Sequence, residues 1–572
     1  MPAKHELPTD PDRPGRPAGA ASRLGLETQR KRPLITAMEI ENFKGIGRPV
    51  RIDLRPITLL FGRNSAGKST ILHAVCYAHE ILSQHSVGAG KTTLGGEQVD
   101  LGSFRRFVHA QDTGRRVHLT FEIDLAGRSL SGQLHTDDMQ YLPIEKDELD
   151  QAADTVTSGW LKLRIGWNQR LKTPSVESYA VGVDEDCVGR IETAAETDEP
   201  SLARFLPNLQ HSVFTRAGFN EKTAVFRPGG WALLQPSVLP VWGETLPIFP
   251  RSTLNDSESD DEFNCEAEFN YFASALMVGV GQLVKDELAA FRYIGPMRDV
   301  RPTQDDDSVA ELGMPVAVRE VLGRPPLPDP TGRAHWSDGS AAWEVLRKSR
   351  TGPVGSDLIR DVDDWMSRDD RLNTGYHVER QTVVELSADH PSVSSIRQGV
   401  PKEDIDVSAL ITAVADADTR STVRLKEVES ELVMETTSVG VGISQVLPVV
   451  VAALDPERPG ITGIEQPELH VHPKIQVELG DLFAQGVDDG GVFLIETHSE
   501  HLMLRLLRRI EETHSGELPQ GKPALRPDQV SVVFVERVEG EVRATPLRID
   551  QTGEFIDRWP QGFFDERADE LF

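Results

Sequence analysis

The chain has 572 residues, of which 61 are Lys or Arg and 90 are Asp or Glu, so its formal net charge is −29. A surface this acidic excludes a protein that coats nucleic acid or anionic membranes indiscriminately, and any basic binding site must be local. Hydrophobic residues make up 38% of the chain and charged residues 26%, which is typical of a folded protein and excludes disorder along the whole length.

Two further features bear on where the chain resides. Its longest strongly apolar run, residues 446–454, contains a proline and is far shorter than the ~20 residues of a membrane-spanning helix. The first residues lack the apolar stretch of a secretory signal, and the only cysteines, Cys76, Cys187 and Cys265, are not closely paired. We therefore expect a reduced, cytoplasmic protein without a membrane span.

Residues 1–37 are expected to form a disordered, basic, proline-rich tail. They hold six prolines, no apolar periodicity, and seven Lys or Arg against four Asp or Glu. Such a tail can contact nucleic acid, but its only basic cluster is residues 30–32, so a plain tail is favoured. Folded structure should begin with the alternating segment that follows.

A glycine-rich loop lies between the first buried strand and the first helix. Residues 57–61 (ITLLF) indicate the strand, and apolar residues at helical spacing indicate the helix over 71–82. Residues 62–69 (GRNSAGKS) fit the phosphate-binding pattern G-x-x-x-x-G-K-[ST]. In this pattern backbone N–H groups surround phosphate oxygens, Lys68 supplies charge, and the Ser69 hydroxyl can ligate Mg²⁺. The candidate nucleotide-binding residues here are Gly62, Asn64, Ser65, Gly67, Lys68, Ser69 and Thr70.

The middle of the chain is less informative. Residues 126–430 mix short alternating segments with helix-like stretches, without an internal repeat. Residues 255–269 carry many acids and no Lys or Arg, which fits a cation site but more often indicates a solvated loop. We expect this region to consist of insertions on the sheet that carries the glycine loop.

A second small-residue loop precedes a strongly apolar helix. Ser438, Gly440, Gly442 and Ser444 at a helix start form a potential phosphate cradle. We expect the helix to be capped near Ser444, which places Pro448 in its first turn.

Two later strands end in polar residues. Glu465 closes the apolar stretch GITGIE and is the expected Mg²⁺-side carboxylate, together with Ser69. Gln466 and Glu468 are the candidates for positioning the attacking water, with an acidic turn after an edge strand as the plainer alternative. The strand VFLIE is followed by His498, placed where an imidazole could touch a γ-phosphate, although a histidine there is often structural.

These motifs, in this order, resemble the head of ABC-type ATPases, and most closely the bacterial OLD-like "AAA family" group related to RecF and SMC. The resemblance rests on MEIENFKGI, FRYIGPMR, IEQPELHVHP and ETHSEHLMLRLL as well as the phosphate loop. It implies an α/β fold with a mixed sheet, interrupted by a large α+β insertion. The head would comprise residues 38–125, a strand near 291–298 within the insertion 126–430, and residues 431–572 with a terminal hairpin.

The resemblance also implies roles for individual residues. ATP and Mg²⁺ would be sandwiched between two copies of the chain, with Lys68 and Ser69 of one copy holding the nucleotide. The segment Ser438 to Gln445 of the other copy would cap the γ-phosphate, and His498 would be the switch histidine. Gln111 is the candidate for the glutamine loop of such heads.

Two departures from the family pattern matter. The signature is SVGVGISQ where LSGGQ is usual. The expected contact of this segment with the γ-phosphate therefore rests on its position in the chain more than on the identity of its residues. Gln466 stands where a catalytic Glu is usual. An amide can orient water but cannot accept its proton, so hydrolysis should be slow unless Glu468 serves instead.

We therefore expect an ATP-hydrolysing switch that dimerises around ATP and signals to a separate effector protein, and the resemblance suggests anti-phage defence. The alternatives are a DNA-repair ATPase of the RecF or SMC kind and a nucleotide-stabilised scaffold without turnover. Nucleic-acid binding is open but not indicated by charge. OLD-family nucleases carry a Toprim domain after the ATPase, and the 74 residues after His498 are too few for one, so no nuclease is expected here.

Overall fold

The computed structural model describes residues 33–84, 99, 101–135, 146–170, 172–193, 203–219, 231–233, 238–248, 260–298, 335–349, 357–384, 386, 390–398, 401, 406–417, 419–434, 440–455 and 460–559. Most of the expected tail therefore lies outside the described residues. Strand β1 (Ile35–Glu41) starts inside the tail's expected bounds, so the boundary at residue 37 is wrong by three residues. Ile35 and Ala37 are buried on one face of β1, which explains why they belong to the fold.

A six-stranded mixed sheet carries the motifs. Its order is β10-β14-β15-β3-β16-β17, and only the last pair is antiparallel. The strands are β3 (Ile57–Phe61), β10 (Arg292–Ile294), β14 (Ile461–Glu465), β15 (Val492–Glu496), β16 (Val530–Val538) and β17 (Glu541–Leu547). The mixed sheet and its terminal hairpin are thus as expected.

The register of this sheet sets the position of the site. Strand β15 lies between β14 and β3, with Glu465 opposite Glu496 and Glu496 opposite Leu60. Because these strands are parallel, their carboxyl ends meet at one edge, where the glycine loop leaves β3. Residues from three distant parts of the chain therefore converge there.

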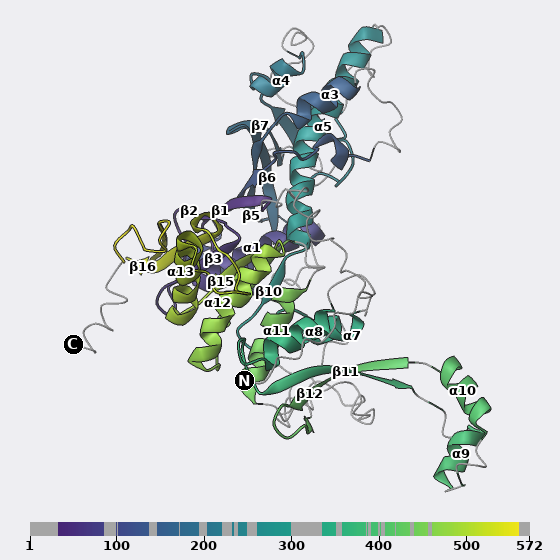
Figure 1. Cartoon of the computed structure of the whole chain (residues 1–572). Helices are drawn as coiled ribbons and strands as arrows, with labels where there is room; N and C mark the ends of the chain where they lie inside the picture. Colours follow the sequence, from purple (N-terminus) through teal and green to yellow (C-terminus); the bar gives the residue numbers. More distant parts are fainter. Residues whose placement is uncertain are drawn as a thin grey trace, which may run out of the picture. The chain divides into compact units, whose positions relative to one another are not determined.

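The helices next to this sheet are α1 (Lys68–Gln84), α11 (Val441–Leu454), α12 (Pro473–Asp488) and α13 (Glu500–Ser515), labelled in Figure 1. The expected start of α11 is wrong, because the helix begins at Val441 with Gly440 as N-cap and Pro448 lies in its interior. The Ser444 hydroxyl donates to the carbonyl of Val441, 2.7 Å away, and so does not cap the helix.

An eight-stranded antiparallel sheet, of order β2-β1-β4-β5-β6-β7-β8-β9, forms a second layer of structure. The strands not yet given are β2 (Val50–Asp53), β4 (Val117–Asp124), β5 (Ser158–Asn168), β6 (Thr173–Val183), β7 (Asp186–Thr193), β8 (Ala203–Pro207) and β9 (Trp231–Leu233). The boundary expected at residue 125 therefore separates β4 from β5, two neighbours in one sheet that are paired along the whole length of β4. The first part of the insertion extends the head instead of standing apart from it.

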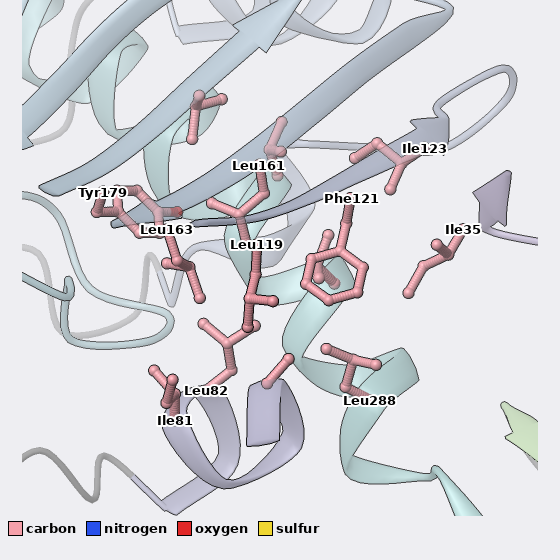
Figure 2. Close-up of a cluster of buried hydrophobic side chains, with 14 of the residues drawn as sticks. Ile35, Ile81, Leu82, Leu119, Phe121, Ile123, Leu161, Leu163, Tyr179 and Leu288 are labelled. Atoms are coloured by element: carbon pink, nitrogen blue, oxygen red, sulfur yellow. The ribbon is translucent and has the colours of Figure 1, made fainter. Parts of the chain in front are cut away.

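One face of this sheet packs on the long helix α5 (Asp260–Ala289) and on α1. Figure 2 shows Leu119 and Phe121 of β4 facing Leu288 of α5 and Leu82 of α1. All four side chains are fully or almost fully buried, and burying such a side chain contributes about 1.5–3 kcal/mol. The shared core fixes α1, and hence the glycine loop at its start.

Short helices at this sheet are α2 (Phe104–Phe107), η1 (His109–Gln111), η2 (Ser131–Gln133), α3 (Lys146–Asp154) and α4 (Ser212–Arg216).

The remaining insertion forms a three-stranded sheet, β11 (Tyr376–Val384), β12 (Thr419–Glu427) and β13 (Val433–Met434). Its helices are α7 (Ser340–Lys348), α8 (Leu358–Ser367), α9 (Pro391–Arg397) and α10 (Val407–Asp416), and η8 (Pro527–Gln529) precedes β16. Among the described residues, no helix combines the length and apolarity needed to span a membrane.

Candidate nucleotide-binding site

The glycine loop has a backbone that only glycine can adopt at two positions. Gly62 has φ 147°, and a Cβ there would lie 2.0 Å from the carbonyl oxygen of Val535. Gly67 has φ 108°, and its Cβ would lie 2.5 Å from Cγ2 of Val542. The terminal hairpin β16–β17 therefore packs directly against the loop, and neither glycine tolerates a side chain.

Lys68 is buried inside this loop. Its Nζ donates to the carbonyl oxygens of Gly62 and Arg63, each 3.0 Å away, and lies 3.8 Å from Oε1 of Glu496. Burial lowers the pKa of Lys68, while Glu496, Glu468 and Glu465 oppose this shift. The side chains of Asn64 and Ser65 are exposed, and Thr70 is half-buried. The ammonium group is thus held at the centre of a loop whose outer rim is open.

Ser69 contacts a carboxylate that sequence reasoning did not include among the site residues. Its hydroxyl donates a 2.6 Å hydrogen bond to Oε2 of Glu496 at the end of β15. Burial and then the charge of Glu465 raise the pKa of Glu496 to about 7, against the opposing effects of Ser69 and Lys68. The signal for Glu496 was present, since it ends a buried strand just before His498.

Glu465 is held by residues that the sequence did not bring together. Its Oε1 accepts a 2.8 Å hydrogen bond from the Tyr293 hydroxyl and lies 3.3 Å from Nε2 of His73. The other ring nitrogen of His73 lies 2.5 Å from Nζ of Lys44. The structure thus places Ser69 against Glu496, and Glu465 against Tyr293 and His73.

The two candidates for positioning water differ in their surroundings. Gln466 has φ 44°, and its backbone N–H donates to the carbonyl of Glu496, 2.8 Å away. The carboxylate of Glu468 accepts hydrogen bonds from the His498 backbone N–H, at 2.6 Å, and from the Thr497 hydroxyl, at 2.9 Å. Burial raises the pKa of Glu468, against the opposing effect of the hydrogen bonds from His498 and Thr497.

His498 has an unused ring nitrogen. Within the described chain, its Nε2 is buried without a hydrogen-bond partner. Burial, and then the charge of Lys68, lower the pKa of His498 to about 4, so the ring is neutral at pH 7. An unpaired nitrogen beside Lys68 fits a nearby phosphate oxygen.

The second small-residue loop is only partly described, and Ser438 lies outside the described residues. A Cβ at Gly442 would lie 2.9 Å from the carbonyl of His470, so the start of α11 packs closely on the turn after β14. Gln445 is buried, and its Nε2 donates to the carbonyl of Arg298 at 2.9 Å. Gln445 is therefore engaged within its own chain.

Gln111 and the other histidines lie apart from these contacts. Gln111 is exposed at the end of η1, beside His109, whose Nδ1 lies 3.0 Å from the carbonyl of Lys44. His472 caps α12 by accepting from the Lys474 N–H, and His470 and His501 are exposed. Across the described segments, no group of three or more His, Cys, Asp or Glu is arranged as a metal site.

The residues present fit Mg²⁺ bound together with a nucleotide. A serine hydroxyl and carboxylates are the oxygen ligands that Mg²⁺ prefers, and Mg²⁺ usually shares them with phosphates and water. The mutual repulsion of Glu465 and Glu496 is the kind that a divalent cation relieves. Ser69, Glu496 and Glu465 would hold the ion and its water shell, and the ion would neutralise phosphate charge.

Comparisons with known proteins agree with this geometry. A model described as an AAA ATPase domain matches residues 376–503, and one described as an AAA domain matches residues 37–80. A family described as a protein of unknown function matches residues 525–572. No curated protein matches the chain at a significant level.

Solved SMC heads are similar at low identity. They include an SMC head bound to the C-terminal winged-helix domain of ScpA (10% identity, TM-score 0.35, 91% of this chain and 99% of that one). Others are a Pyrococcus furiosus head bound to the C-terminal domain of ScpA (8%, 0.35, 94% and 98%) and a Thermotoga maritima head (8%, 0.32, 90% and 100%). The two AAA models match the segments that contain the glycine loop and the strands β14 and β15, and each model covers less than half of the chain.

Proposed function

We propose that this chain binds ATP with Mg²⁺ in the glycine loop, hydrolyses it slowly, and uses the cycle as a switch. The observation that carries the proposal is the contact of Lys68 and Ser69 with Glu496 at the carboxyl edge of the sheet. It joins the phosphate-binding loop to a strand-end carboxylate, as phosphoryl transfer requires. When bound, Mg²⁺ supplies charge neutralisation for the phosphates.

Glu468 is the proposed base for the attacking water. Its two hydrogen bonds come from the His498 N–H and the Thr497 hydroxyl, so it is tied to the strand end nearest the glycine loop. Gln466 can orient water through its amide but cannot take the proton. We expect this arrangement to be slower than the usual one, because Glu468 stands two residues beyond the position where the catalytic Glu is usual, and slow turnover suits a switch.

Dimerisation around ATP is proposed for the start of α11. Gly440 at its N-cap is exposed, Val441 is 60% exposed, and the first turn of this 14-residue helix provides backbone N–H groups and a positive dipole end. A second copy could receive a γ-phosphate there. Gln445 would support this helix start and would not itself contact the γ-phosphate, because its side chain is bound to Arg298 of its own chain.

The proposed output is a signal to a separate effector protein, and anti-phage defence is the proposed setting on the resemblance alone. DNA repair is less favoured, because two of the five basic residues in and near η1 are paired with acids; the five are Arg105, Arg106, His109, Arg115 and Arg116. Arg115 lies 3.6 Å from Asp112, and Arg116 lies 3.1 Å from Glu177. The remaining alternative, a scaffold that binds ATP without turnover, rests on Gln466, whose amide cannot accept a proton.

A trapped variant tests the switch. The Glu468→Gln chain should bind ATP with Mg²⁺ and remain dimeric by light scattering, while the wild type should dimerise and then return to monomer as phosphate is released. The matched control is Glu177→Gln, a partly buried carboxylate that pairs with Arg116 away from the glycine loop. Turnover by Glu468→Gln equal to the wild type would refute the role of Glu468, and a mass that ATP does not change would refute the sandwich.

A further inference from the structure

The segment from β10 to Arg298 contacts the hydrolytic site at two points. We infer that Tyr293 and Arg298 are positioning residues for ATP hydrolysis, which fix Glu465 and join it to the start of α11. This inference rests on the proposed function. It adds two residues that act on ATP hydrolysis through Glu465 and α11, without contacting the nucleotide.

Tyr293 fixes the carboxylate of Glu465. Strand β10 runs parallel to β14, with Tyr293 beside Gly463, and the phenol reaches along the strand to Oε1 of Glu465 at 2.8 Å. The missing side chain at Gly463 leaves room for Phe291, which would lie 2.8 Å from a Cβ there. A phenol is protonated at neutral pH, so the Tyr293 hydroxyl donates this bond.

His73 of α1 is the second residue that contacts Oε1 of Glu465. Its Nε2 lies 3.3 Å from the same oxygen and 3.3 Å from the Tyr293 hydroxyl. Helix α1 and β10 thus hold one oxygen of Glu465 between them. Both contacts hold Oε1, so Oε2 would be the oxygen of Glu465 that turns to Mg²⁺ or its water shell.

Arg298 ties the backbone of the same residue to α11. Its side chain is 1% exposed, Nη2 donates to the carbonyl of Glu465 at 2.5 Å, and Nη1 donates to the carbonyl of Gln445 at 2.9 Å. Gln445 returns a bond of 2.9 Å from Nε2 to the carbonyl of Arg298. A fork of two parallel donors is what distinguishes Arg from the single ammonium group of Lys.

This junction also contains unused hydrogen-bonding capacity. Within the described chain, Nε of Arg298 and Oε1 of Gln445 are buried without partners. Buried polar atoms are rarely left unpaired, so a small shift of α11 against β14 could gain a bond that this arrangement lacks. A movement at the end of β14, where Glu465 lies, would then be transmitted through Arg298 to the start of α11, the proposed contact with a second copy.

The test compares kcat and KM for ATP in Tyr293→Phe and Arg298→Lys. Each should lower kcat by roughly 10- to 100-fold, because misplacement of catalytic groups by about an ångström has that effect. KM and Mg²⁺-ATP binding should change by less than about threefold, since neither residue contacts the glycine loop. The kcat values are therefore referred to the fraction of chain that binds Mg²⁺-ATP. A purely structural role would lower the melting temperature and this fraction but leave kcat per ATP-binding chain unchanged.

Matched controls are Tyr179→Phe and Arg505→Lys. Tyr179 is buried and donates to the carbonyl of Met277, and Arg505 lies between Glu478 and Asp481, each 3.1 Å away. Both should keep wild-type kcat. Tyr293→Phe with unchanged kcat would overturn the inference even if Arg298→Lys fails to fold. A wild-type chain without turnover would overturn the proposed function and this inference with it, whereas wild-type turnover with active variants would overturn the inference alone.

Discussion

The hydroxyl of Ser69 donates a 2.6 Å hydrogen bond to Oε2 of Glu496, and this bond joins the start of α1 to the end of β15. The two residues are 427 positions apart in sequence and meet because β15 pairs directly with β3. The carboxylate nearest the phosphate-binding loop therefore belongs to the strand that precedes His498. Glu465 lies one strand further along the sheet.

Replacing Glu496 by Gln should weaken Mg²⁺-dependent ATP binding. The amide keeps a hydrogen bond to Ser69 but loses the charge, and charge-assisted hydrogen bonds are worth about 1.5–3 kcal/mol, or roughly 10- to 100-fold in affinity. Titration with a fluorescent ATP analogue, with Mg²⁺ and with EDTA, measures the change. Glu177→Gln is the control, and equal Mg²⁺ dependence in the two variants would contradict the assignment.

The pH dependence of stability should identify Glu496. Its pKa is raised to about 7 from an ordinary value of 4.5, so the folded chain binds more protons than the unfolded chain between these values. Its contribution to folding is therefore full below about pH 4.5 and is lost as pH rises towards 7. Loss of roughly 1–3 kcal/mol is expected over this range in the nucleotide-free chain.

His498 acts in the opposite direction, because its pKa is lowered to about 4 and its contribution to stability grows as pH rises from there to 6.5. The measurement is therefore a comparison of urea unfolding at pH 5 and pH 7 in the wild type and Glu496→Gln. The variant should gain stability relative to the wild type as pH rises. A constant difference between the two chains would refute the shift.

Gln466→Glu should raise turnover. A glutamate there restores a proton acceptor at the position after Glu465, next to the carbonyl of Glu496 that holds its backbone. General-base catalysis contributes about 10²–10⁴-fold where it is fully used, so a severalfold rise in kcat is a conservative expectation. Phosphate release measures it. A fall in kcat would contradict this expectation and would show that the neutral amide is needed to orient the water.

Gly67→Ala should abolish ATP binding, and Val542→Ala should restore it only in part. The added methyl would lie 2.5 Å from Val542, and trimming that valine removes the clash but not the unfavourable φ of 108°. Binding of a fluorescent ATP analogue reports both effects, with Val542→Ala alone as control. Full restoration in the double variant would mean that the hairpin, and not the backbone, sets the requirement for glycine.

Motifs with local periodicity were predictable, whereas contacts between distant strands were not. The strand, glycine loop and helix around Lys68 lie in one continuous segment, and so does the hairpin that turns at Glu539 and Gly540. Glu496 and Tyr293 depend on strand order, which no single segment encodes. The start of α11 was misplaced because Ser444 bonds backward to Val441, and a serine near a helix start does not reveal which of these bonds it forms.

The most direct measurement is steady-state phosphate release from ATP with Mg²⁺ by the purified wild-type chain, beside Lys68→Ala. Lys68 is the group at the centre of the phosphate-binding loop, so its loss should remove nucleotide binding and turnover together. Slow, Mg²⁺-dependent turnover in the wild type that disappears in Lys68→Ala is the predicted result. Phosphate release no faster than that of Lys68→Ala would contradict hydrolysis by this chain.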